Sequence, residues 1–180
     1  DYALKNITMS IKPNEKIALV GHNGAGKTTL IKLIIRLYDV SEGEITLNDT
    51  PISKYILAEY RDLFGTVFQN YKVFSLSVTN NILLKLNPND QEKILAIDGM
   101  KNSGIYDKIS TLPKGADTIL TREFDDEGAV LSGGECQKIA ISRVFAKPCE
   151  IVILDEPSST LDPVSEYQMY ESMMKACKNK

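Results

Sequence analysis

The stretch Gly21-His22-Asn23-Gly24-Ala25-Gly26-Lys27-Thr28 decides the fold of this chain. It matches the pattern G-x-x-x-x-G-K-[ST] in full. Its glycines let the backbone turn so that successive N–H groups point at one anion, and a helix starting there adds its positive dipole end. Lys27 has the reach for the β- and γ-phosphates of ATP, and the Thr28 hydroxyl suits Mg²⁺. We therefore expect a nucleotide-phosphate loop.

The segments on either side of this loop support that interpretation over a chance glycine-rich turn. Residues 16–20 form a short apolar run that predicts a strand, and residues 28–38 have the spacing of an amphipathic helix. A strand, a glycine loop and a helix in that order are the context in which the pattern is meaningful. Further patterns predict strands at 7–11, 44–47 and 65–68, and a short helix at 57–63.

The middle of the chain has a different texture. Helical patterns cover 77–86, 90–100 and 105–109, and the charged residues 122–128 predict a surface loop. Strand-rich flanks around a helical middle indicate an inserted subdomain. Beyond it we expect a helix at 134–146, a strand buried on both faces at 151–154, and a last helix from Pro163 to about Cys177.

Two acidic residues follow the apolar run at 151–154. They lie at the carboxyl end of the predicted strand, the edge where open α/β sheets bind ligands. Asp155 would hold Mg²⁺ through a water, and Glu156 would be the general base for the attacking water. Alone, such an acidic pair is as often a solvated strand end as part of a catalytic site. Together with the phosphate loop, it supplies the second half of an ATP-hydrolysis site.

The sequence Leu131-Ser132-Gly133-Gly134-Glu135 leads into the helix predicted at 134–146. Exposed N–H groups, a helix N-terminus and a hydroxyl would make a second anion-binding loop. Serine before a helix is also a common N-cap, and local sequence favours that simpler interpretation.

Composition limits the classes of function. The chain of 180 residues has 43% hydrophobic and 25% charged residues and a net charge of −3, as expected of one globular domain. No basic excess indicates nucleic-acid binding. The apolar runs are shorter than the ~20 residues that a membrane span needs. Three cysteines without metal-ligand spacing predict reduced thiols.

Taken together, these segments resemble the nucleotide-binding domain of the ATP-binding cassette (ABC) family. The family's elements occur in order: the Walker A loop at 21–28, a Q-loop glutamine at Gln69, the signature at 131–135, the Walker B strand with Glu156, and a D-loop at 159–162. The resemblance covers nearly the whole chain. Runs at 37–39, 43–45, 66–69 and 74–82 are similar to exporter-type cassettes, whereas the loop at 122–128 and Cys136 depart from their usual form.

The resemblance implies an α/β P-loop NTPase fold with a RecA-like core. We expect a mostly parallel sheet with antiparallel edge strands, a nucleotide-binding core at 1–70 and 129–180, and a helical subdomain at 71–128, within a single domain of residues 1–180. The chain opens at Asp1 without an initiator methionine, and the family's switch histidine and adenine-stacking aromatic have no counterpart in it. We therefore expect a domain truncated at both ends, with weak or no ATPase activity by itself.

The resemblance also assigns roles by position. Catalysis would depend on Glu156, Lys27 and Gln69, and Mg²⁺ ligation on Thr28, Gln69 and Asp155. ATP would contact Gly21, His22, Asn23, Gly24, Ala25, Gly26, Lys27, Thr28 and Thr29. Ser132, Gly133 and Gly134 would contact the ATP of a second cassette, and Asp162 would link the two sites.

The implied cofactors are ATP and Mg²⁺, and the implied partners are a second cassette in a head-to-tail dimer and a transmembrane domain on the same full-length chain. The domain would hydrolyse ATP to drive export at the cytoplasmic face of the cell membrane, without a nucleic-acid partner. Three alternatives stay open: a chromosome-maintenance or DNA-repair ATPase, a translation-factor cassette, and a non-catalytic nucleotide-binding module. The first usually has a long coiled coil between the Walker A loop and the signature, and no sustained heptads occur here.

Overall fold

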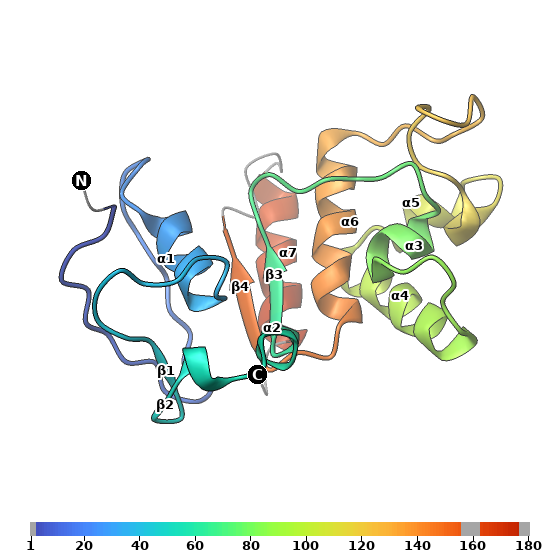
Figure 1. The fold of residues 1–180 in the computed structure, drawn as a ribbon. Coiled ribbons are helices and arrows are strands. Elements are labelled where there is room, and N and C mark those ends of the chain that lie inside the picture. The colour runs from blue at the N-terminus through green and yellow to red at the C-terminus, as the bar shows by residue number, and fades with distance from the viewer. Residues whose placement is uncertain (1–2, 156–162, 177–180) are drawn as a thin grey trace.

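A computed structural model describes residues 3–155 and 163–176 of the chain. Its centre is a parallel pair of strands, β3 (Phe64–Val67) and β4 (Ile151–Leu154). Figure 1 shows this pair between helix α1 (Lys27–Ile34) on one side and α6 (Gly133–Ala146) on the other. Parallel neighbours need a long crossover connection, and here it contains most of the helices. The expected α/β architecture is confirmed.

Strand β4 has the predicted position but not the predicted burial. Ile151 and Ile153 pack against a cluster that includes Tyr60 and Phe64, and Val152 and Leu154 pack against the cluster on α6, so both faces are covered. All four side chains are nonetheless half-buried instead of fully buried. In the described part of the chain β4 pairs with β3 alone, and its other edge adds to the exposure.

The strands predicted at 7–11 and 16–20 are not present. Both segments are exposed and without regular secondary structure, and no backbone ladder joins them to another described segment. Val20, directly before the phosphate loop, is 93% exposed. A period-two or apolar pattern indicates which side chains favour burial. A strand forms only where the backbone of another strand pairs with its N–H and C=O groups.

Helix α1 ends at Ile34, four residues before the predicted end at Tyr38. Arg36 adopts a left-handed conformation (φ 56°), and Leu37 N–H closes the end by donating to the Lys32 carbonyl. The side chain of Arg36 then donates to the carbonyls of Ile52 and Tyr55. Those tertiary hydrogen bonds, which the local pattern does not reveal, set the end of the helix.

A small antiparallel hairpin follows, formed by β1 (Thr46–Leu47) and β2 (Thr50–Pro51). Strand β1 is shorter than the strand predicted at 44–47, and strand β2 was not predicted. Asn48 and Asp49, between the strands, both have positive φ, as a two-residue hairpin turn requires. A short 3-10 helix, η1 (Ile52–Lys54), and helix α2 (Leu57–Asp62) lead on to β3, which begins one residue before the predicted position.

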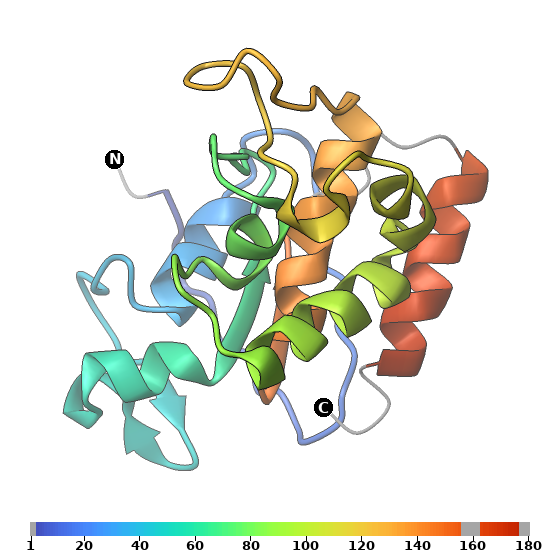
Figure 2. The ribbon, with the colours of Figure 1, turned by 90° about the vertical axis from the view of Figure 1, so that its right-hand side faces the viewer.

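The middle of the chain is helical, as predicted. It contains α3 (Val78–Leu83), α4 (Asp90–Ser103), α5 (Tyr106–Ser110) and the 3-10 helix η2 (Gly115–Asp117). These helices share one apolar cluster with α6, to which Val78, Met100 and Ile139 each contribute a fully buried side chain. Figure 2 shows them in front of α6, on the side away from α1.

The remaining segments also follow the predictions. Residues 122–128 form a surface loop with Phe124 88% exposed. Helix α7 begins at Pro163 and is described to Ala176; Cys177 lies outside the described residues. None of the described helices is long and apolar enough to cross a bilayer.

Candidate nucleotide site

The loop at 21–28 precedes and opens helix α1. Gly26 is the N-cap of the helix with φ 91°, and Gly24 has φ 81°. Both values lie in the region that residues with a Cβ rarely adopt. At Gly26 a Cβ would also come within 2.6 Å of the Leu4 side chain. Gly24 and Gly26 are therefore required by the backbone path of this loop.

Lys27 is the first residue of α1, and its side chain folds back over the loop. Its ammonium donates to the carbonyls of Gly21 at 2.9 Å and of His22 at 3.3 Å. Within the loop, Ala25 N–H donates a turn hydrogen bond to the same His22 carbonyl. A cation is thus held over the loop, where a phosphate group would meet it.

Thr28 joins this loop to the far end of the sequence. Its hydroxyl donates to the Asp155 carboxylate at 2.7 Å, across 127 positions of the chain. Asp155 follows β4 directly, its N–H continues the ladder to the Val67 carbonyl, and it is only 4% exposed. Two of the three residues expected to lie beside Mg²⁺ are therefore in direct contact.

Gln69 reaches the same edge of the sheet from the neighbouring strand. Val67 pairs with Leu154, so Gln69 and Asp155 follow the carboxyl ends of adjacent parallel strands. Gln69 lies in a turn and is exposed. Glu156 and Asp162, expected as the general base and as the link between two sites, lie outside the described residues.

The signature residues begin helix α6. Ser132 is its N-cap: its hydroxyl accepts from Glu135 N–H at 3.3 Å, and the Glu135 carboxylate accepts from Ser132 N–H at 2.8 Å. The N-cap predicted at Ser132 is therefore confirmed. Ser132 and Gly133 are exposed, so the cap leaves this helix start accessible.

Electrostatics favour an ionised Glu135 in this cap. The hydrogen bond from Ser132 N–H lowers the pKa of Glu135 despite a partial opposing effect of burial, and Lys108, 3.4 Å away, lowers it further. Cys136 behaves differently: burial, with the nearby Glu135 charge, raises the pKa of its thiol. Cys136 is therefore a poor nucleophile.

The phosphate loop and the signature do not form one site within this chain. Helices α1 and α6, which carry them, lie on opposite sides of the β3–β4 pair (Figures 1 and 2). The exposed start of α6 therefore lies apart from the phosphate loop of the same chain.

The contacts that two side chains, Tyr71 and Arg143, make at α6 were missed from the sequence. The Tyr71 hydroxyl donates to the Gly133 carbonyl at 3.1 Å, and Arg143 of α6 donates to the carbonyls of Lys72 and Asn81. Both connect residues 62 or more positions apart, so no local pattern signals them. They tie the segment after Gln69 to the signature helix.

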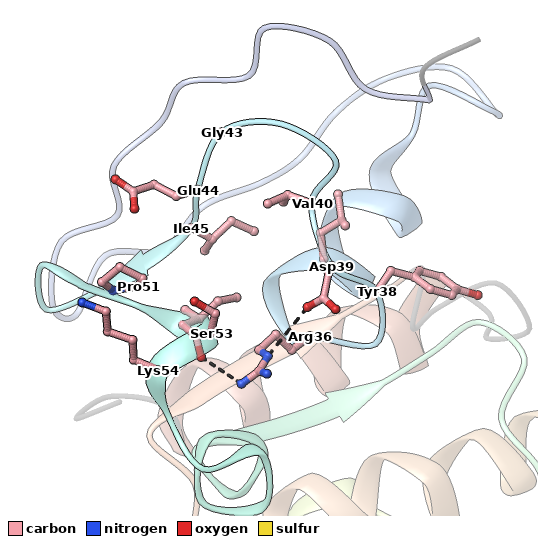
Figure 3. Close-up of a pocket in the computed structure, with 12 residues that line it drawn as sticks. Arg36, Tyr38, Asp39, Val40, Gly43, Glu44, Ile45, Pro51, Ser53 and Lys54 are labelled. Carbon is pink, nitrogen blue, oxygen red and sulfur yellow. Dashed lines mark hydrogen bonds and ion pairs between the residues drawn. The ribbon is translucent and has the colours of Figure 1, made fainter.

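A separate hollow of about 360 Å³ lies beside the end of α1 (Figure 3). Its lining comes from the end of α1, the segment after it, β2 and η1, and includes none of the expected site residues. Arg36 in its wall already binds the Ile52 and Tyr55 carbonyls and lies 4.0 Å from Asp39. This hollow is therefore separate from the candidate nucleotide site at the loop before α1.

A glycine loop opening a helix, with its threonine bonded to an aspartate at the end of a parallel strand, defines a P-loop NTPase. Residues 4–159 match the family model described as "ABC transporter". The chain belongs to this family.

Relatives and a solved structure agree with that assignment. The chain is 38% identical to an ATP-dependent lipid A-core flippase of Alkalilimnicola ehrlichii, over 97% of this chain and 29% of the flippase. It is 36% identical to the multidrug resistance-like ATP-binding protein MdlA of Escherichia coli, over 95% of this chain and 28% of MdlA. A bacterial Atm1-family ABC exporter with ATP bound superimposes with a TM-score of 0.81 at 30% identity, over 93% of this chain and 28% of the exporter. The chain thus spans under a third of the length of these proteins.

Proposed function

We propose that this chain is the ATP-binding and ATP-hydrolysing domain of an ABC exporter. The observation that carries the proposal is the Thr28–Asp155 hydrogen bond, which brings the phosphate loop and the acidic strand end into one site. The similarity to exporters and flippases supports export as the work that hydrolysis drives.

Mg²⁺ fits the residues at this site. A hydroxyl and a carboxylate in contact are oxygen ligands of the kind this ion prefers, with substrate phosphates completing its shell. Thr28 would bind the ion directly, Asp155 through a water, and Gln69 from the neighbouring strand end. The ion would neutralise charge on the β- and γ-phosphates.

The rest of the chemistry would fall to this chain's own groups. The N–H groups of residues 21–29 would bind the phosphates, and Lys27 would exchange its two loop carbonyls for the β- and γ-phosphate oxygens. Glu156 would accept the proton of the water attacking the γ-phosphorus, in line with the leaving oxygen.

A second cassette would complete the site. The accessible start of α6 would present Ser132, Gly133 and Gly134 to the γ-phosphate of a partner, and Asp162 would link the two sites. The separation of α1 and α6 supports this arrangement, because one chain does not bring both loops together.

The domain boundaries and the setting complete the proposal. Residues 1–70 and 129–180 would form the nucleotide-binding core and 71–128 the helical subdomain, at the cytoplasmic face of a membrane. A transmembrane domain on the same full-length polypeptide would be the second partner. The share of the exporters and flippases that this chain spans supports that inference.

The test compares two lysines of the same helix. Lys27→Ala in the intact protein should weaken ATP binding tenfold or more in a titration with Mg²⁺. The control Lys32→Ala removes the same charge from α1 and should bind ATP like the wild type.

A second variant tests the chemistry. Glu156→Gln, made in the otherwise wild-type intact protein, should bind ATP but lose turnover. Undiminished binding by Lys27→Ala, or undiminished turnover by Glu156→Gln, would refute the assignment.

A further inference from the structure

Three consecutive carbonyls at the end of helix α1 accept hydrogen bonds from side chains of helix α2. The Tyr60 hydroxyl donates to the Ile34 carbonyl at 2.6 Å. Arg61, the next residue, donates to the Ile35 carbonyl at 3.4 Å and to the Arg36 carbonyl at 2.6 Å. The last carbonyls of a helix have no donor within the helix, so they need donors from elsewhere. Two neighbouring side chains of α2 supply those donors here.

Both donors are well placed to hold this end of α1. Tyr60 is 2% exposed, and its ring meets the Phe64 ring edge-on, with 5.1 Å between the ring centres. Burial raises the pKa of Tyr60, so its hydroxyl keeps the proton that it donates. The half-buried Arg61 brings a positive charge to the helix end at which the macrodipole is negative, and its planar guanidinium reaches two carbonyls at once.

The opposite end of α1 is held by the strand pair that follows α2. Thr28, the second residue of α1, donates to Asp155 directly after β4. Strand β4 pairs with β3, and β3 begins two residues after α2 ends. Among its eight residues, all of them in the described part of the chain, α1 buries only Ile31. With so little apolar packing, the hydrogen bonds at its two ends decide where the helix lies.

We propose that Tyr60 and Arg61 are positioning residues of the nucleotide site, which hold the carboxyl end of α1 so that the phosphate loop at its other end meets the phosphates. A helix of eight residues is a rod about 12 Å long, so a shift at one end also displaces the other. The consequence for nucleotide binding rests on the proposed function, because the helix start carries Lys27 and the N–H groups of the loop.

The first test compares two tyrosines in the intact protein. Tyr60→Phe removes the hydroxyl that holds α1 and keeps the ring. The matched control Tyr55→Phe also loses a hydroxyl-to-carbonyl hydrogen bond, of 2.9 Å to Leu47, and its ring lies 5.7 Å from that of Tyr60. The Tyr55 hydroxyl serves the β1–β2 hairpin and not α1.

Tyr60→Phe should raise the dissociation constant of ATP about 3- to 10-fold, as the loss of one hydrogen bond predicts, whereas Tyr55→Phe should bind ATP like the wild type. A merely structural role of Tyr60 would leave the ATP affinity of the folded variant equal to that of the control, and that result would overturn the proposal. Arg61→Lys keeps the charge but not the planar fork, so it should weaken binding to a similar degree. Wild-type affinity in Arg61→Lys would refute the positioning role of Arg61.

Hydrogen exchange without nucleotide tests the mechanical step separately. In Tyr60→Phe the amides of residues 24–31 should exchange about 3- to 10-fold faster than in the wild type and in Tyr55→Phe, although the lost hydrogen bond lies at the other end of the helix. Unchanged exchange at 24–31 would overturn the proposal. A wild-type protein that does not bind ATP would instead refute the proposed function, while the exchange comparison would still decide whether α2 holds the phosphate loop in place.

Discussion

Replacing Thr28 by valine tests the contact on which the nucleotide site depends. The change removes the hydroxyl that donates to Asp155 at 2.7 Å and keeps the branched shape of the side chain. Asp155 is 4% exposed, so water has little access to replace the lost donor. A hydrogen bond to a charged group contributes about 1.5–3 kcal/mol, and we expect the free energy of unfolding to fall by that amount.

A second threonine supplies the control. Thr79 is the second residue of α3, as Thr28 is of α1, and it is 5% exposed. Its hydroxyl donates to the neutral carbonyl of Ala116 at 3.1 Å. Valine at either position costs the same in helix propensity, but Thr79→Val loses a neutral hydrogen bond of about 0.5–1.5 kcal/mol. The difference between the two variants isolates the contribution of the Asp155 carboxylate.

The assay is urea unfolding at pH 7 without nucleotide or Mg²⁺, followed by nucleotide titrations with and without Mg²⁺. Thr28→Val should lose more stability than Thr79→Val and should also lose the gain in ATP affinity that Mg²⁺ gives. Thr79→Val should keep that gain. If Thr28→Val is no less stable than Thr79→Val, the hydrogen bond does not hold the two halves of the site together, and the reasoning is refuted.

Three further predictions concern helices α4 and α6. Gly99→Ala should lower the free energy of unfolding by about 1–2 kcal/mol, since its Cβ would lie 2.7 Å from the Ser142 carbonyl oxygen and overpacking outweighs the better helix propensity; an unchanged urea midpoint would contradict this close packing. Asn89→Ala removes the cap of α4 and should cost about 1 kcal/mol in the same assay. The hydrogen bond from Ser132 N–H lowers the pKa of Glu135 in the folded protein below its ordinary 4.5. The ionised Glu135 side chain therefore stabilises the folded protein above pH 4.5, and this stabilisation is lost as the pH falls through the pKa of the folded protein. The stability difference between wild type and Glu135→Gln should therefore shrink in acid, and a constant difference between pH 7 and pH 3 would count against it.

Much of this molecule follows from local sequence. The glycine pattern predicted a turn and a helix start at 21–28, because positive φ at Gly24 and Gly26 excludes most other residues. Ser132 predicted an N-cap at the start of α6, since a cap is satisfied within a few residues. The helices of the middle segment and strand β4 were predicted for the same reason: their signals are short-range periodicities. The family, too, could be read from motifs in order along the chain.

Tertiary structure decided what depends on a distant partner. Residues 7–11 and 16–20 have strand patterns, but no strand in the described part of the chain pairs with them. Helix α1 ends at Ile34, where Arg36 donates hydrogen bonds to carbonyls of another segment. The contact between Thr28 and Asp155 exists only because β3 and β4 pair in parallel and place the strand end beside α1. The sequence by itself determined which residues form helices, turns and a phosphate loop, since those choices are settled within a few residues. Only the folded chain decided which strands pair and which side chains meet, because hydrogen bonds and burial are supplied by residues far away in sequence.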